Sequence, residues 1–161
     1  MLESGTTVFS PSKKKDIYAL GKVQNNFTRK LLARIGGFLY SKIPRATIRN
    51  AYFGLPSLES RRRLFDVCMV HKLLHSPASW QSSTFFKLIP SRTRGGCHKP
   101  SYMRARTKLR NNVFAIRAVA AYLKLTKDVV ISPSFSRFKR IMSAKILGPL
   151  VTKLCLVHFY F

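Results

Sequence analysis

The chain has 161 residues, and 30 Lys+Arg against 5 Asp+Glu give it a formal net charge of +25. That length fits one domain, and an apolar content of 46% excludes a chain that is disordered by composition. A sequence pI near 11.1 indicates an anionic partner, or else strong self-repulsion in the compact state. The acids stand too far apart for a local two-metal carboxylate site, since they are only Glu3, Asp16, Glu59, Asp66 and Asp128.

The first predicted helix begins at Asp16, which is suited to cap it, and ends at Gly36-Gly37. Residues 1–15 precede it as an extended segment. Apolar residues recur at steps of three and four, and we expect them to form one inward face: Ile17, Leu20, Val23, Phe27, Leu31 and Ile35.

Two more helices are expected in the next forty residues. A short one covers residues 46–52, and a longer one runs from an N-cap at Ser57 to about His75. Three arginines stand side by side near the start of the longer helix. They suit a grip on the phosphate backbone of a nucleic acid, and equally an ion pair along the helix with Glu59 or Asp66. They are Arg61, Arg62 and Arg63.

Residues 76–112 are rich in proline and glycine and show no helical period. Within them, residues 85–89 (FFKLI) fit either a short strand or a buried loop anchor. From Val67 to Lys127 the sequence has no acid but has twelve Lys+Arg. A compact domain rarely keeps so long a loop without a functional reason, so this loop is the predicted binding element.

Two further helices are predicted over residues 112–125 and 135–146, the second after a cap region at residues 132–134. We expect two sets of inward residues, namely Val113, Ile116, Val119, Ala120 and Leu123, then Phe138, Ile141 and Met142. The predicted fold is mainly α: a loose bundle of three to four amphipathic helices, with a long basic loop between the second and third. Residues 16–142 form the helical region and residues 143–161 an apolar tail.

Sequence-independent contact with phosphates is the expected chemistry of the basic residues, because Lys and Arg release counterions when they bind RNA or DNA. Phe85, Phe86 and Tyr102 are candidates for base stacking, although core anchoring is the more common role of such aromatics. The candidate nucleic-acid-binding residues are Arg61, Arg62, Arg92, Arg94, Arg104, Arg106, Lys108 and Arg110.

A metal site is not expected. Cys68, His71 and His75 follow one another at helical steps, but their spacing is not that of a zinc site. Packing of Cys68 in the core, with His75 at the helix end, is the favoured interpretation. No cofactor is predicted. The tail could lie on a membrane surface, but it is short for spanning and broken at Gly148-Pro149, so docking onto the body or local disorder is favoured over a membrane partner.

An ordered series of landmarks resembles the C-terminal part of reverse transcriptases from non-LTR (LINE-like) retrotransposons of the jockey and RTE types. Residues 2–11 resemble the family's LEYG…VW(S/N)P stretch, and residues 16–29 its DI..LEKVQ..FTR stretch. Residues 54–75 resemble LGLPSLE.RR…D…YK(I/L)LH, and residues 93–95 the family's TRG. Further matches are Phe114, Arg117 and Val119, then Ser134, Phe138 and Lys139.

The resemblance implies the region after the polymerase palm, equivalent to a thumb and C-terminal segment. In the family the palm lies upstream and carries the magnesium-binding aspartates, and no position here matches one, so no catalytic residue is assigned. The chain departs from the family's pattern at Gly21, at His71 and over residues 121–126. The expected function is that of a polymerase fragment that is not an enzyme and binds nucleic acid without sequence preference.

Two other interpretations stay open. One is a small basic interaction protein with a membrane-associated tail, and the other is a reading frame without function. Three scattered cysteines do not make a disulfide scaffold, and residues 1–5 lack the features of a secretory signal. We therefore expect an intracellular location, and the nucleus is compatible with this expectation.

Overall fold

The computed structural model describes residues 5–36, 40–75, 84–90, 98–125 and 134–148. The described chain is mainly helical, which confirms the predicted fold class. Its helices and strands are α1 (Lys14–Gly36), the 3-10 turn η1 (Tyr40–Lys42), α2 (Ala46–Tyr52), α3 (Leu58–His75), β1 (Leu88–Pro90), β2 (His98–Pro100), α5 (Lys108–Asn111), α6 (Phe114–Leu123) and α8 (Phe135–Leu147).

Two of the three predicted helix caps are present. The Ser57 hydroxyl accepts a hydrogen bond from the Ser60 amide at 3.1 Å, and the Ser134 hydroxyl accepts one from the Arg137 amide at 3.5 Å. The prediction for Asp16 is wrong, because α1 begins at Lys14 and places Asp16 inside its first turn. There the carboxylate faces the positive end of the helix dipole, which favours a negative charge without a cap.

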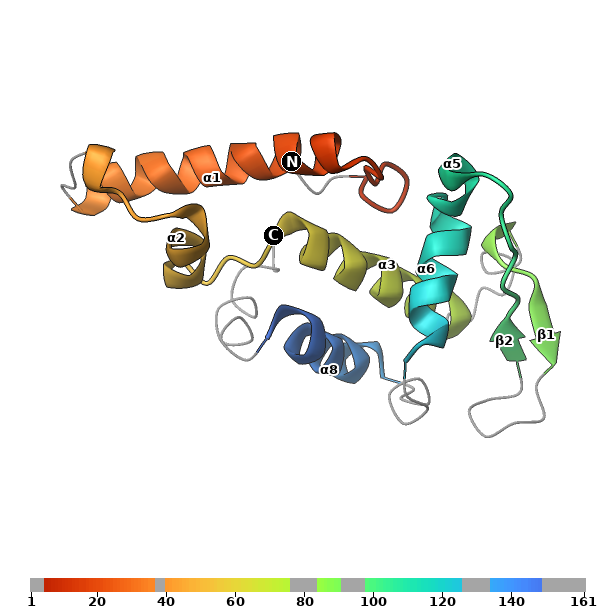
Figure 1. Ribbon diagram of the computed structural model, residues 1–161. Helices are drawn as coiled ribbons and strands as arrows, with labels where there is room; N and C mark the ends of the chain where they lie inside the picture. The colour runs from red at the N-terminus through yellow and green to blue at the C-terminus, as the bar shows by residue number, and fades with distance from the viewer. Residues whose placement is uncertain (1–4, 37–39, 76–83, 91–97, 126–133, 149–161) are drawn as a thin grey trace.

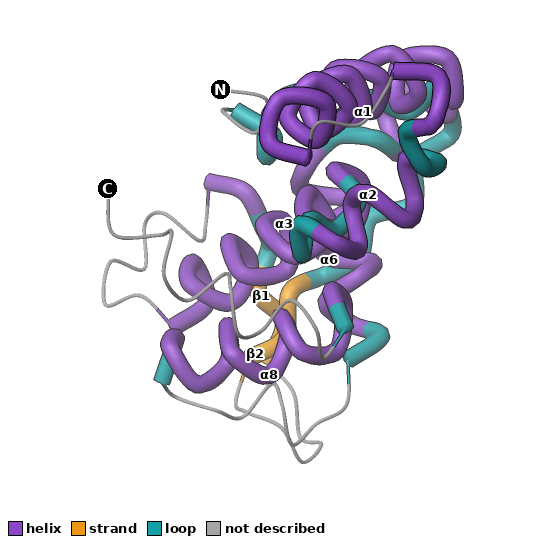
Figure 2. The backbone as a smooth tube through the Cα atoms, turned by 90° about the vertical axis from the view of Figure 1, so that its left-hand side faces the viewer, coloured by secondary structure: helices purple, strands orange, loops and turns teal. Residues whose placement is uncertain are grey.

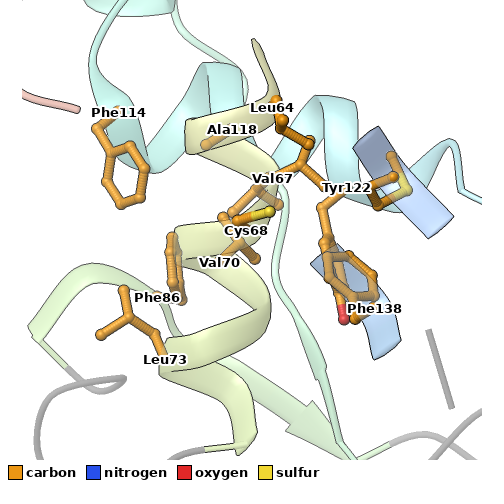
Figure 3. Packing of buried hydrophobic residues seen from close by; sticks show 12 residues of the cluster. Leu64, Val67, Cys68, Val70, Leu73, Phe86, Phe114, Ala118, Tyr122 and Phe138 are labelled. Carbon is orange, nitrogen blue, oxygen red and sulfur yellow. The ribbon is translucent and has the colours of Figure 1, made fainter. Parts of the chain in front are cut away.

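The hydrophobic core lies around α3. Figures 1 and 2 show α3 between α1 on one side and α8 on the other, with α6 crossing beside it. Figure 3 shows side chains from α3, α6 and α8 packed together with Phe86. The buried cluster consists of Leu64, Val67, Cys68, Val70, Leu73, Phe86, Phe114, Ala118, Val119, Tyr122, Phe138 and Met142.

An aromatic stack forms the centre of this core. The rings of His71 and Phe138 lie parallel, with centroids 3.7 Å apart and planes at 1°. His71 Nδ1 and the Tyr122 hydroxyl share a hydrogen bond of 3.1 Å. The three side chains come from α3, α6 and α8, so this one cluster fixes how the three helices pack.

The predicted inward face of α6 is partly wrong. Val113 and Leu123 are exposed, whereas Phe114 and Tyr122, which were not predicted to be inward, are buried. The aromatic partners of Phe114 and Tyr122 explain why α6 is rotated relative to the predicted orientation. Phe114 packs edge-on against Phe85 at 5.8 Å, and Tyr122 bonds His71, so the helix turns the row of residues 114, 118 and 122 toward α3.

The predicted inward face of α1 is also wrong. Val23, Phe27 and Ile35 are 49%, 62% and 72% exposed, and the buried residues of α1 are Gln24, Thr28 and Leu32. Helix α1 packs mainly on α2, and it touches the body through the start of α3. Its more polar side therefore faces the protein, and half of its apolar row is exposed while the other half is half-buried.

Hydrogen bonds explain this orientation of α1. The Thr28 hydroxyl is bonded to the carbonyl of Asn25 at 3.1 Å and to Asn50 Oδ1 at 3.3 Å. Arg49 of α2 donates to the Asn25 carbonyl at 3.0 Å, and the Gln24 amide donates to the Pro56 carbonyl at 3.3 Å. Buried polar groups need such partners, so this network sets which side of α1 meets α2 and the start of α3.

A two-stranded antiparallel hairpin interrupts the helices. β1 and β2 pair Leu88 with Pro100 and Pro90 with His98. Both interpretations of residues 85–89 are confirmed in part, since Leu88–Pro90 is a strand and Phe86 is a buried anchor. The short helix α5 was not predicted. Four residues are too few for a recognisable helical period, and its Thr107 cap is the only local signal.

Candidate nucleic-acid interface

The candidate site is the segment that leads from β2 through α5 to α6. We call its four cations, Arg104, Arg106, Lys108 and Arg110, the basic strip. All four side chains are exposed. Figure 1 shows this segment running from the hairpin along the outside of α6 to α5. It contributes nothing to the buried core, so its charge faces solvent rather than the protein.

Local hydrogen bonds hold the segment that carries the strip at two points. At its start, the Ser101 amide donates to the Lys87 carbonyl at 2.7 Å, which extends the pairing of the hairpin. Near its end, the Thr107 hydroxyl caps α5 by accepting from the Arg110 amide at 3.3 Å. The cations of the strip therefore stand on a surface segment that hydrogen bonds fix near Ser101 and at Thr107.

A buried arginine anchors the residues that follow the strip. Arg117 of α6 forms an ion pair with Asp66 of α3 at 2.8 Å, and its Nη1 donates to the carbonyl of Asn112 at 2.6 Å. Its Nη2 donates to the carbonyls of Thr6 and Thr7, at 3.0 and 2.8 Å. The same guanidinium thus joins α3, the α5–α6 junction and the N-terminal turn, and so positions the end of the strip.

The two described acids of α3 pair with arginines outside the strip. Asp66 is buried against Arg117, and Glu59 pairs with Arg63 at 3.0 Å on the surface of α3. The sequence contains no acid between Val67 and Lys127. Burial raises the pKa of Asp66 above its ordinary value, while the hydrogen bond and charge of Arg117 oppose that rise.

The three adjacent arginines of α3 have three different environments. Arg62 is buried, at 4% exposure, so the protein surface does not present its guanidinium to a ligand. Arg63 is exposed and paired with Glu59, which confirms the ion-pair interpretation for this residue. Arg61 is half-buried and interacts with neighbouring groups. Because Arg62 is buried, it does not share an exposed surface with the strip, which contradicts its assignment as a nucleic-acid-binding residue.

Two candidates, Arg92 and Arg94, lie outside the described residues. One cation that was not selected from the sequence lies next to the start of the segment that carries the strip. Lys87 is exposed, and its carbonyl bonds the amide of Ser101. Only the pairing of the hairpin brings residue 87 next to residue 101, and no local sequence pattern indicates that contact.

The three aromatic candidates separate by exposure. Phe86 is 3% exposed and belongs to the core, which confirms core anchoring for that residue. Phe85 is 43% exposed but packs edge-on against Phe114. Tyr102 is 45% exposed and stands two residues before Arg104. Of the three, Tyr102 therefore best combines an accessible ring with nearby positive charge.

The cysteine and the first histidine of α3 lie in the core. Cys68 is buried, which confirms its packing interpretation, and so is His71, whereas His75 is exposed at the last position of α3, as predicted. Burial raises the pKa of the Cys68 thiol to about 11. Among the described residues, no group of three or more His, Cys, Asp or Glu side chains could hold a metal ion. Nor does any described helix have the length and apolar character needed to cross a membrane. The predicted tail, apart from residues 143–148, lies outside the described residues.

Compared with known proteins, the chain matches no family model, and no curated protein or solved structure is significantly similar to it.

Proposed function

We propose that this chain is a segment of a LINE-like reverse transcriptase that lacks the catalytic palm and binds the backbone of RNA or DNA without sequence preference. The observation that carries the binding proposal is the basic strip. Four exposed cations stand within seven residues, in a stretch of sequence without acids. Such one-signed charge repels itself unless an anion neutralises it, and a polyanion does so with release of counterions.

Contacts between the landmark residues support the family part of the proposal. Gln24, from the stretch that resembles DI..LEKVQ..FTR, bonds the carbonyl of Pro56, from the stretch that resembles LGLPSLE. Asp66, from the same stretch as Pro56, forms the largely buried ion pair with Arg117 of a further landmark. A folding role for these residues gives a physical reason for their presence at these positions.

The chemistry proposed for the chain is binding and not polymerisation. The sequence has no Asp-Asp pair, and its acids are widely separated. Of the acids that the structure describes, Asp66 and Glu59 are engaged by arginines of the same chain. Two-metal nucleotidyl transfer needs clustered carboxylates, so this chain can hold a polyanion but has no means of extending it.

A matched pair of quadruple variants tests the proposal. Replacing Arg104, Arg106, Lys108 and Arg110 by Gln should weaken binding to a fluorescent single-stranded RNA or DNA by roughly tenfold or more, because four phosphate contacts are lost. The control replaces four exposed cations near the start of α1, which are Lys13, Lys14, Lys15 and Lys22.

Both variants lower the net charge by the same amount, from +25 to +21, so a general effect of charge would weaken them equally. The proposal predicts the larger loss for the strip variant. Equal losses, or a larger loss for the control, would contradict the assignment of the site. Circular dichroism of both variants verifies that their helices are intact.

A further inference from the structure

The outward row of α1 has the pattern of a contact surface. Its residues recur at steps of three and four and therefore share one side of the helix: Leu20, Val23, Phe27, Leu31 and Ile35. Val23, Phe27 and Ile35 are exposed, and Leu20 and Leu31 are half-buried. Figure 1 shows α1 along one edge of the molecule, contacting α2 and the start of α3. A contiguous exposed apolar row is typical of a protein–protein contact.

Two opposite charges mark the ends of this row. Asp16 lies in the first turn of α1 and Arg34 in the last, and both side chains are exposed. The two residues are 18 positions apart, which is about five helical turns, so both charges stand on the same side of α1. Phe27 is about three turns from Asp16, which places the charges in line with the apolar row.

The row is complementary to itself in the antiparallel direction. If a second α1 lies against the first with a twofold axis at the level of Asn25, Asp16 faces Arg34 of the second copy. Val23 then faces Phe27, and Leu20 lies within one residue of the level of Leu31, each pair being formed twice. This is the arrangement that a twofold symmetric interface requires, since one surface must fit its own copy.

We propose that the outward row of α1 is a dimerisation surface for a second copy of this chain. The two ion pairs between Asp16 and Arg34 commit the surface to that occupant and to the antiparallel direction. A nucleic acid would not serve, because its charged backbone cannot cover an apolar row. The inference is separate from the proposed function, which rests on the basic strip.

The net charge determines how the dimer responds to salt. Each copy carries +25, so the two copies repel one another at low ionic strength. Screening weakens that long-range repulsion, and the apolar contacts are not weakened by it. A single helix face is also small beside the roughly 20–30 residues per side of a standard interface, so the association should be reversible. Added NaCl should therefore favour the dimer, whereas it weakens nucleic-acid binding.

Sedimentation equilibrium of the full chain, freed of nucleic acid, tests the inference from low to high micromolar concentration. The expected result is a reversible monomer–dimer equilibrium that shifts toward dimer when NaCl is raised. A chain that stays monomeric throughout, or forms dimers only at low salt, would overturn the inference. Nucleic-acid binding has no bearing on either outcome, so the two proposals can fail separately.

Variants at exposed positions of α1 identify the surface. Phe27→Asp should abolish the dimer, and Asp16→Arg should weaken it by placing like charges together. The double change Asp16→Arg with Arg34→Asp should restore it, because the pairs form with reversed signs. Tyr18→Asp is the matched control, since Tyr18 is 73% exposed and lies two and a half turns from Phe27, on the opposite side.

The outcome of these variants is decisive in either direction. A dimer that persists in Phe27→Asp, or that Tyr18→Asp disrupts equally, would show that another surface associates. Failure of the double charge reversal to restore the dimer would overturn the antiparallel arrangement. All substituted side chains are exposed, but the charge changes at Asp16 and Arg34 oppose the helix dipole, so far-UV circular dichroism of each variant verifies that α1 stays helical.

Discussion

The guanidinium of Arg117 binds both carboxylate oxygens of Asp66, a residue 51 positions earlier in the chain. Its Nε donates to one oxygen at 2.8 Å and its Nη2 to the other at 3.0 Å. Both side chains are largely buried, at 14% and 10% exposure. This pair links α3 and α6 with the N-terminal turn, so it governs both the fold and the position of the basic strip.

Removing one member of this pair should destabilise the protein strongly. Asp66→Asn leaves the Arg117 charge buried without its counterion, which is expected to cost about 3–5 kcal/mol in the free energy of unfolding. Arg117→Met should have a similar effect, and the double variant should lose less than the sum of the two. Urea denaturation followed by circular dichroism measures all three.

The exposed pair between Arg63 and Glu59 is the control for that experiment. Because both of its side chains are in contact with water, Glu59→Gln should change the free energy of unfolding by no more than about 1 kcal/mol. An equally small loss for Asp66→Asn would contradict the structural importance of the buried pair.

The aromatic centre gives a second stability prediction. Phe138 is fully buried against His71 and Tyr122, so Phe138→Ala should cost about 3–5 kcal/mol by removing apolar contact and leaving a cavity. Phe135 stands one turn earlier on α8 and is 39% exposed. Phe135→Ala should therefore be far milder in the same urea titration. Comparable losses at the two positions would mean that α8 does not pack as described.

How far the sequence predicts this fold depends on where each element obtains its contacts. Helices α3 and α8 were predicted to within about a residue, because Ser57 and Ser134 cap them locally. The inward side of α1 was not, since Thr28 and Gln24 find their partners in Asn50 and Pro56, which lie 22 and 32 residues away. A hydrophobic period detects an apolar row but not whether that row is covered.

In the candidate site, too, features set by adjacent residues can be predicted from the sequence, and features set by distant contacts cannot. The charge of the basic strip is a property of adjacent residues, so the sequence alone reveals it. The burial of Arg62 depends on how α3 is rotated in the folded chain, and no local pattern contains that information. Lys87 lies next to Ser101, at the start of the segment that carries the strip, only because the hairpin pairs its two strands.

Cys68 provides a chemical test of the core. Burial raises the pKa of its thiol to about 11, and the thiolate is the reactive form. At pH 8 roughly one thiol in a thousand is then ionised, so iodoacetamide should leave Cys68 unmodified in the native protein. As pH rises toward 11 the labelling should increase.

Peptide mapping by mass spectrometry measures that labelling, and the same reaction in denaturant is the control, because unfolding removes the burial that raises the pKa. Rapid modification of Cys68 at pH 8 in the native chain would contradict its position in the core.

The salt dependence of binding tests the central claim most directly. Fluorescence anisotropy with a single-stranded oligonucleotide gives the binding constant at a series of NaCl concentrations. The account predicts a linear fall of log K with log salt, little difference between base sequences, and a slope reduced by about 3 when the four cations of the strip are replaced by Gln. Failure of the unaltered chain to bind RNA or DNA at ~50 mM salt, where phosphate contacts are strong, would contradict it.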